Sequence, residues 1–340
     1  MTRIPTVTGD IDVDDLGVTL MHEHIFIRTP DLQEAFPGFM GWDEERELAN
    51  ARKHLAEIKQ GGVDTIVDMT VPGLGRSVKR IAAAVEGTGL NVILVTGYYT
   101  YTDLPFPMKY NGPGKLFDDP EDRILVDLFV GDIKDGIEGT DIRAGVLKCC
   151  TDEPGVTPDI ERLIRAVAKA HLETDVPIQT HTHALSRRGL DQQRILKEEG
   201  VDLSRVVIGH SNETTDLDYL TELMENGSFI GYDRCGLDIV TDLEAQVDTL
   251  AELCRRGYAE KIVVSHDRHC RSDWFHEEDV LRVLPKWNHE YVQGGLTPAL
   301  QERGVTDDQI HQMMTVNPRA FFAASSAGAT AKTAAAKASA

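Results

Sequence analysis

Six ionisable residues each lie at or near the end of a short apolar, strand-like run in this sequence. Four are histidines, one is a lysine and one is an aspartate, and helix-like stretches separate the runs. In a closed parallel barrel the C-terminal ends of all strands meet around one mouth, so residues far apart in the sequence would gather there. Imidazole and carboxylate ligands suit zinc, cobalt, manganese or iron better than calcium or magnesium. The pattern therefore predicts a metal site built from His22, His24, Lys148, one of His181 and His183, His210 and Asp267.

Each of these residues also has an ordinary interpretation when it is taken alone. His22 and His24 share one face of a strand, because strand side chains alternate, but two histidines also occur together in polar turns. A lone lysine such as Lys148 usually extends its amine to the surface, and Asp267 could cap a following helix. Six such residues at the ends of five strands favour a metal site over six separate coincidences.

Lys148 acquires a special role if it lies beside two dications. Positive neighbours disfavour its ammonium form and leave a neutral amine, which can add carbon dioxide and become a carbamate, a bridging carboxylate on a long arm. Two metal ions bridged by a hydroxide would then provide a strong nucleophile near neutral pH. His181 and His183 share one strand face, and alternation alone does not say which of the two is a ligand.

Alternating strand-like and helix-like segments must position these residues. Such alternation predicts a parallel sheet covered by helices, and eight strands are the number that closes a (β/α)8 barrel. The alternative is an open doubly wound sheet, which would place a ligand at a single switch point. The predicted strands cover residues 18–24, 63–69, 91–96, 143–148, 176–182, 206–210, 228–232 and 262–267.

Residues 1–324 are expected to form the barrel as one domain. Residues 3–7 and 10–20 are expected to form a small hairpin that caps its base. The Ala/Ser/Lys-rich tail 325–340 has no aromatic residue and is expected to be disordered. The longest loop, 268–296, follows the last strand, where barrel enzymes often place substrate specificity. Predicted helices cover 42–62, 120–139, 157–175 and 214–227.

Composition narrows the classes of partner. The 340 residues include 35 Lys and Arg against 56 Asp and Glu, a formal net charge of −21. Such a surface repels phosphate backbones and anionic lipid, so we expect neither a nucleic-acid nor a membrane partner. The chain has no apolar run of about 18 residues, and its first residues lack a secretory core. Five irregularly spaced cysteines are typical of a reduced, cytoplasmic protein.

The order of the motifs resembles the phosphotriesterase family of the amidohydrolase superfamily. The motifs are HEH, GVLKC with TDEPGVTP, THTHA, IGHSNETTDLDYL, GSFIGYDRCGLD and SHD, and the resemblance extends from Ile4 to Phe322. It implies a (β/α)8 barrel with two divalent metals, most commonly zinc. It also implies that His183 is not a ligand. By resemblance, the more buried metal is held by His22, His24 and Asp267, the more exposed one by His181 and His210, and carboxylated Lys148 bridges them with a hydroxide.

Two segments, GYYTYTDLPF and GYDRCGLD, resemble the lactonase branch of the family. Tyr99 matches a tyrosine that lactonases place over the metals, and Arg234 matches their active-site arginine. Cys235 departs from the aromatic residue that many lactonases have there. The resemblance implies a homodimeric lactonase, acting on N-acyl-homoserine lactones in quorum quenching, with slow phosphotriesterase activity. The alternatives are a primary organophosphate hydrolase or another amidohydrolase on the same barrel, and a non-catalytic binding protein.

In the expected mechanism the bridging hydroxide attacks the lactone carbonyl. Asp267 accepts the hydroxide proton and returns it toward the leaving alkoxide. Tyr99 helps to stabilise the oxyanion, and Arg234 orients Tyr99 or the lactone ring. Trp274 and Phe275, in the predicted loop 268–296, offer apolar surface for an acyl chain.

Overall fold

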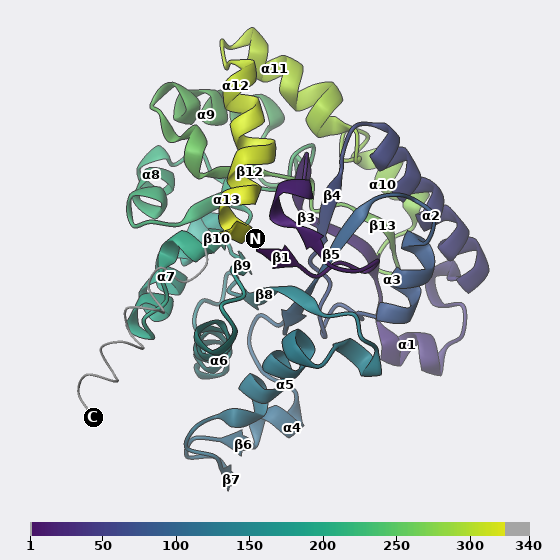
Figure 1. Ribbon diagram of the computed structural model, residues 1–340, viewed down its shortest axis with the longest axis vertical. Helices are drawn as coiled ribbons and strands as arrows, with labels where there is room; N and C mark the ends of the chain where they lie inside the picture. Colours follow the sequence, from purple (N-terminus) through teal and green to yellow (C-terminus); the bar gives the residue numbers. More distant parts are fainter. Residues whose placement is uncertain (1, 324–340) are drawn as a thin grey trace.

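The computed structural model describes residues 2–323, so the predicted tail 325–340 lies outside the described residues. At the centre of the molecule is a sheet of nine parallel strands surrounded by helices (Figure 1). The sheet runs in the order β12-β11-β10-β9-β8-β5-β4-β3-β13. Its strands are β3 (Thr19–Ile27), β4 (Thr65–Asp68), β5 (Asn91–Gly97), β8 (Ala144–Cys150), β9 (Ile178–His181), β10 (Val206–Ile208), β11 (Phe229–Tyr232), β12 (Ile262–Val264) and β13 (His269–Ser272).

The last two strands, β12 and β13, form an eighth barrel strand that is interrupted around Asp267. The Asp267 amide donates a hydrogen bond to the carbonyl of His22 at 3.0 Å, and the His24 amide donates to the carbonyl of Arg268 at 2.9 Å. Beyond this point β13 pairs with β3. These bonds close the sheet into a ring, so the predicted (β/α)8 barrel is confirmed and the open doubly wound alternative is wrong.

Alternating strand residues fill two separate layers. In β5, Val92 and Leu94 belong to the apolar cluster between strands and helices, whereas Ile93 and Val95 belong to the cluster inside the barrel. Both faces of each strand are therefore buried, which explains why the strands read as nearly continuous apolar runs. The barrel interior is therefore a packed, largely apolar core, and the ionisable side chains of the predicted site lie at its C-terminal mouth.

Side-chain caps mark the starts of several of the helices that cover the sheet. Asp43 accepts a hydrogen bond from the amide of Arg46 at the start of α2, and Thr157 accepts from Ile160 at the start of α6. The main covering helices are α2 (Glu44–Gln60), α3 (Val78–Val85), α5 (Arg123–Lys134), α6 (Pro158–Thr174), α7 (Arg188–Glu198), α8 (Leu217–Glu225), α9 (Leu243–Arg255), α11 (Thr297–Glu302), α12 (Asp307–His311) and α13 (Asn317–Ala323).

One predicted helix, 120–139, is shorter than expected. Helix α5 begins at Arg123 instead of at Pro120. Asp122 has a left-handed backbone with φ 53°, which no helix interior permits. The carboxylate of Asp119 instead accepts a hydrogen bond from the amide of Arg123 at 2.6 Å.

The N-terminal hairpin lies at the base of the barrel, as predicted. Strands β1 (Arg3–Ile4) and β2 (Ile11–Asp12) pair antiparallel. The amide of Val7 donates to the carbonyl of Val92 near the start of β5. Ile4 also belongs to the apolar cluster inside the barrel, together with Phe321 of α13. The hairpin and the last helix therefore close the barrel at the end opposite its mouth.

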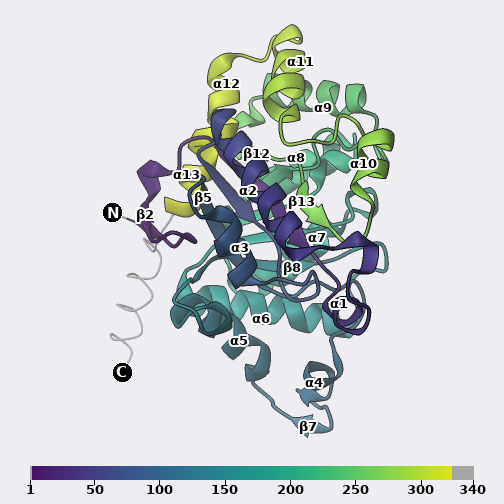
Figure 2. The same cartoon turned by 90° about the vertical axis from the view of Figure 1, so that its right-hand side faces the viewer.

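Two segments extend beyond the regular barrel. Helix α4 (Phe106–Lys109) and the short strands β6 (Asn111–Gly112) and β7 (Phe117–Asp118) project away from it (Figures 1 and 2). The segment 268–296, expected to be one long loop, instead contains β13, helix α10 (Glu277–Val283) and a π-helical turn at Val292–Leu296. A short helix, α1 (Pro30–Ala35), follows β3. None of the helices described is long and apolar enough to cross a membrane.

Candidate metal centre

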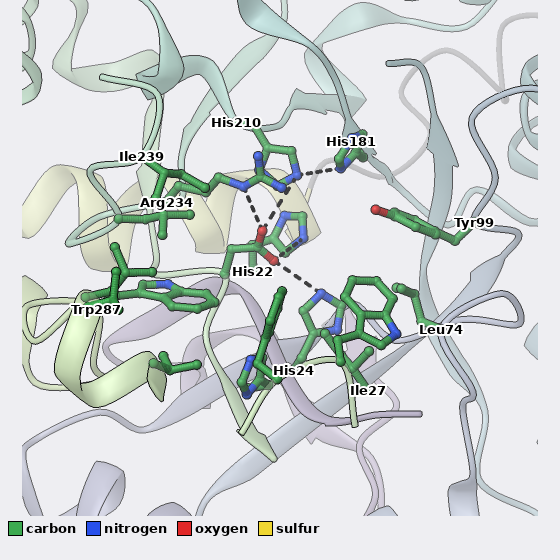
Figure 3. Close-up of a pocket in the computed structure, with 18 of the residues that line it drawn as sticks. His22, His24, Ile27, Leu74, Tyr99, His181, His210, Arg234, Ile239 and Trp287 are labelled. Carbon is green, nitrogen blue, oxygen red and sulfur yellow. Dashed lines mark hydrogen bonds and ion pairs between the residues drawn. The ribbon is translucent and has the colours of Figure 1, made fainter. Parts of the chain in front are cut away.

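The six predicted ligands meet at the C-terminal mouth of the barrel, although they come from five strands. They line one cavity of about 440 Å³ (Figure 3). His22 and His24 lie within β3 and Lys148 within β8, His181 ends β9, and His210 and Asp267 follow β10 and β12 by two and three residues. The structure therefore brings together every residue of the predicted metal set.

A bulge in β3 turns the two histidines inward. The register of β3 against β4 shifts between Leu20 and Glu23. Leu20 belongs to the layer beneath the helices and Met21 to the interior of the barrel. Without the shift, His22 and His24 would share the outward face of Leu20, because strand side chains alternate. The bulge re-aims them at the cavity.

The ligand atoms are grouped as a metal site requires. Asp267 Oδ1 lies 3.4 Å from His22 Nε2 and 3.2 Å from His24 Nε2, and the three residues form one of the groups spaced to hold an ion. On the other side, His181 Nδ1 lies 2.8 Å from His210 Nε2. Asp267 Oδ2 is 3.9 Å from the same His210 nitrogen. Asp267 therefore faces both pairs of histidines.

The chemistry of these residues fits divalent cations. Burial lowers the pKa of His24 to about 4 and that of His181 to about 4, so both imidazoles are neutral. Burial also lowers the pKa of His210 well below its usual value. His22 Nε2 is buried and has no hydrogen-bond partner among residues 2–323. Neutral histidines with a free ring nitrogen beside a carboxylate are the donor set that such ions bind.

Lys148 is buried to 1% exposure, which is rare for a lysine. Its Nζ donates a hydrogen bond to the carbonyl of Met69 at 2.8 Å and lies 5.4 Å from the ring centroid of Tyr99. Within the described chain, no carboxylate lies within 4.0 Å of this amine. Burial lowers the pKa of Lys148, which favours the neutral amine.

The outer nitrogen of each histidine ligand is also held, by residues that sequence reasoning missed. Asp233 contacts both His22 Nδ1 at 3.1 Å and His210 Nδ1 at 3.0 Å. His181 Nε2 is 2.6 Å from Asp152 Oδ2, and His24 Nδ1 is 2.7 Å from Thr70 Oγ1. Asp233 directly follows β11, so the pattern of ionisable residues at strand ends also covers it. Thr70 lies two residues after β4 but is not ionisable, so that pattern does not reach it. Asp152 follows Lys148 in the segment KCCTDE, two residues after the end of β8.

Arg234 also lines the cavity (Figure 3). Its Nε donates to Asp267 Oδ2 at 2.8 Å, and its Nη1 donates to Glu213 Oε1 at 2.6 Å. No hydrogen bond between Arg234 and Tyr99 is present in the described part of the chain. Two carboxylates engage its guanidinium instead, and the other alternative, that Arg234 orients the lactone ring, stays a prediction.

Tyr99 follows β5 and lines the cavity. Its hydroxyl forms a hydrogen bond with the hydroxyl of Tyr101, and both rings lie against His181, with centroids 5.5 and 5.3 Å away. Burial raises the pKa of Tyr99 and raises that of Tyr101 to about 12. Both phenols are therefore protonated at neutral pH and can donate.

His183 does not line this cavity, and its Nδ1 contacts Ser186 Oγ at 2.8 Å.

The rest of the cavity wall is largely apolar (Figure 3). Trp274 and Phe275 are 42% and 48% exposed, and Ile239, which also lines the cavity, is 66% exposed. The segment 268–296 contributes most of this wall, as the sequence predicted for the aromatic pair. Its other apolar members are Ile27, Leu74, Leu237, Val280, Val283, Leu284 and Trp287.

Fold and site define a barrel enzyme with a candidate metal centre at the C-terminal face of its strands. The model of the phosphotriesterase family matches residues 2–322, and the chain belongs to this family. The resemblance read from the sequence motifs is thus confirmed at the level of the family, and the chain is a hydrolase.

Known proteins resemble the chain over almost its whole length. A phosphotriesterase homology protein of Mycobacterium tuberculosis is 52% identical over 322 residues, which are 95% of this chain and 98% of the relative. An aryldialkylphosphatase of Saccharolobus solfataricus is 40% identical over 94% of this chain and 99% of its own length. The solved structure of the phosphotriesterase from Mycobacterium tuberculosis matches with a TM-score of 0.91 at 52% identity, covering 94% of this chain and 98% of that one.

Proposed function

We propose that the protein is a metal-dependent lactonase that hydrolyses N-acyl-homoserine lactones or related lactones. The observation that carries this proposal is the division of the cavity, whose base holds the candidate ligands and whose wall is apolar. A lactone ring suits the polar base, and an acyl chain suits the wall that includes Trp274 and Phe275. A substrate with both parts would use the whole cavity.

Two divalent ions, with zinc the first choice, fit the donor set described above. His22, His24 and Asp267 would hold one ion, and His181 and His210 the other, with Lys148 as a bridging carbamate. A carbamate agrees with the burial of Lys148 and with its lowered pKa. When bound, such ions supply Lewis acidity and a hydroxide nucleophile near neutral pH.

The surrounding residues would move protons and stabilise charge. Burial opposes ionisation of Asp267, but His22 and Arg234 outweigh it and hold the pKa of its carboxyl well below the usual range. Asp267 then accepts the proton of the attacking nucleophile and returns it to the leaving alkoxide. The Tyr99 hydroxyl donates to the oxygen on which negative charge develops. Arg234 holds Asp267 in position between the two groups of histidines.

The test compares kcat/KM for lactones of graded acyl-chain length with kcat/KM for phosphotriesters. We expect lactones to be preferred by orders of magnitude, and longer chains to be preferred over short ones. Dialysis against a chelator should abolish the activity, and zinc, cobalt or manganese should restore it. Full activity in metal-free protein, verified by elemental analysis, would contradict the mechanism.

A primary organophosphate hydrolase is the second candidate function. It is favoured by the relative from Saccharolobus solfataricus, whose name is aryldialkylphosphatase. Another relative, from Danio rerio, is named N-acetyltaurine hydrolase and is 25% identical, so amides belong in the same substrate panel. A phosphotriester hydrolysed faster than every lactone would favour the organophosphate hydrolase. An amide hydrolysed faster than every lactone would favour an amidohydrolase.

We also infer that two copies of the chain associate. The projecting segment of α4, β6 and β7 exposes Phe106, Tyr110, Leu116 and Phe117, which are between 47% and 75% accessible. The rings of Phe106 and Tyr110 stack with centroids 5.8 Å apart. Grouped apolar side chains on an otherwise strongly acidic protein are typical of an association surface, and a homodimer would cover them.

A further inference from the structure

One buried carboxylate lies between the two groups of candidate ligands. Asp233, which follows β11, is 0% exposed. Its Oδ2 lies 3.1 Å from His22 Nδ1, and its Oδ1 lies 3.0 Å from His210 Nδ1. Oδ1 also accepts a hydrogen bond from the backbone amide of His210 at 2.7 Å. Under the proposed function, His22 and His210 belong to different metal ions.

Two glycines leave the space that this carboxylate occupies. A Cβ at Gly231 would lie 2.3 Å from Asp233 Oδ2. A Cβ at Gly209 would lie 3.2 Å from the same oxygen and 2.0 Å from the carbonyl of Thr180. Neither glycine has a positive φ angle, so room, and not backbone conformation, is what these positions require.

An ionised carboxylate only accepts hydrogen bonds. Both Nδ1 atoms beside Asp233 must therefore carry their hydrogen, and both Nε2 atoms must keep a free lone pair. The free nitrogens face the cavity, His22 Nε2 toward Asp267 Oδ1 at 3.4 Å and His210 Nε2 toward His181 Nδ1 at 2.8 Å. Asp233 thus selects the tautomer that a metal ligand needs in each ring.

We propose that Asp233 is a positioning residue that couples the two metal ions, because its single carboxylate orients one histidine ligand of each. The inference rests on the proposed metal-dependent function. Asp152 provides the contrast, because it supports His181 alone, at 2.6 Å. Loss of Asp152 removes support at one ion, whereas loss of Asp233 removes support at both.

The experiment measures zinc retention by the zinc-loaded full-length enzyme at graded chelator concentrations, with elemental analysis as the readout. The wild type is expected to bind two ions tightly. In Asp152→Ala one ion should become 10- to 100-fold weaker, the scale reported for losing such a hydrogen-bond partner. In Asp233→Ala both ions should weaken by that factor. Equal zinc retention curves for the two variants, or wild-type retention in Asp233→Ala, would overturn the coupling.

Two further variants keep the test valid if Asp233→Ala does not fold. In Asp233→Asn the side chain has one carbonyl oxygen, which accepts from the backbone amide and the Nδ1–H of His210. Its NH2 group then faces His22 Nδ1. This donor favours the His22 tautomer whose hydrogen is on Nε2, the nitrogen that a metal would need. Gly231→Ala leaves Asp233 intact but displaces Oδ2, the oxygen that His22 contacts. Each should loosen one ion about 10- to 100-fold, and wild-type retention in both would overturn the proposal.

The same measurement separates this inference from the function on which it rests. A wild-type protein that binds no zinc, cobalt or manganese would contradict the proposed function itself. A wild type with two tight ions and variants that keep both would contradict only the role of Asp233. Circular dichroism of each variant, recorded before metal loading, checks that the barrel has formed.

Discussion

Tyr99 and Tyr101 share a hydrogen bond, yet their positions suit them to different tasks. Tyr99 lies above Lys148, whereas Tyr101 is 37% exposed and stacks on His181. A hydroxyl that stabilises charge in the transition state must lie where that charge develops. The Tyr99 ring lies 5.4 Å from the buried Lys148 amine, so Tyr99 is the better candidate and Tyr101 is the natural control.

Tyr99→Phe should lower the kcat for lactones by about 10- to 1000-fold, the scale for losing one oxyanion donor. The ring remains, so the fold and the metal content should not change. Tyr101→Phe removes the neighbouring hydroxyl and should have a much smaller effect on kcat. Steady-state kinetics of both variants provides the measurement. A change confined to KM in Tyr99→Phe would mean that the ring only shapes the pocket.

Lys148→Met should lose most bound metal and activity, because methionine retains the apolar stem without an amine that could carry a carbamate. Elemental analysis and lactone turnover provide the measurements. Short carboxylic acids added to Lys148→Ala, which leaves space, should restore part of both. Undiminished metal binding in the methionine variant would contradict the bridging role.

The sequence predicted the candidate ligands but only part of what supports them. Residue type and position at a strand end were enough for His210 and Asp267, because parallel strands deliver such residues to one mouth. Asp233 has the same position, but its role depends on which nitrogen of each histidine it contacts. The engagement of Arg234 with Glu213 depends in the same way on side-chain orientation, which strand position does not specify.

At the level of elements, the strands were predicted because both of their faces are buried and their apolar runs are continuous. The bulge in β3 was not predicted, because residue types do not reveal the register shift that it introduces. The strand β13 and the helix α10 also escaped prediction, because they lie in a segment without an apolar run. Strand β13, His269–Ser272, is polar and is defined by its pairing with the distant β3.

Helix α6 offers a test of stability against pH. His171, in its last turn, contacts the carbonyl of Val176 through Nδ1 at 2.8 Å. Burial lowers the pKa of His171, so the unfolded chain binds the proton more readily than the native protein. Stability should therefore be lost as the pH falls through the unfolded value of about 6.5.

The variant His171→Gln keeps a side-chain donor for the carbonyl of Val176, but glutamine has no group that titrates. Between pH 7.5 and pH 5 its Tm should fall less than the Tm of the wild type, as measured by differential scanning calorimetry. Parallel pH profiles of the two proteins would show that His171 does not contribute to acid sensitivity.

For the whole molecule, the apolar side chains of the projecting segment determine the expected assembly. Leu116→Lys should convert the proposed homodimer to a monomer, because it places a charge within the apolar surface at its most exposed residue, which is 75% accessible. Light scattering coupled to gel filtration measures the mass. Leu185→Lys, at a 60% exposed leucine of another segment, is the control that should leave the mass unchanged. A wild type that is monomeric at all concentrations would contradict the dimer.

The closure of the barrel at Asp267 has a consequence for the order of folding. The hydrogen bond from the His22 amide to Ser265 Oγ joins residues 243 positions apart in the sequence. The hydrogen bonds of Asp267 and Arg268 to β3 have similar sequence separations. Contacts of such sequence separation form slowly, since the intervening chain must first be brought together. On the ribosome, β3 emerges long before its partner and has to wait for nearly the whole chain. We therefore expect barrel closure to be the last and slowest folding step, and hydrogen exchange during refolding should protect the His24 amide after the amides of β5 and β8.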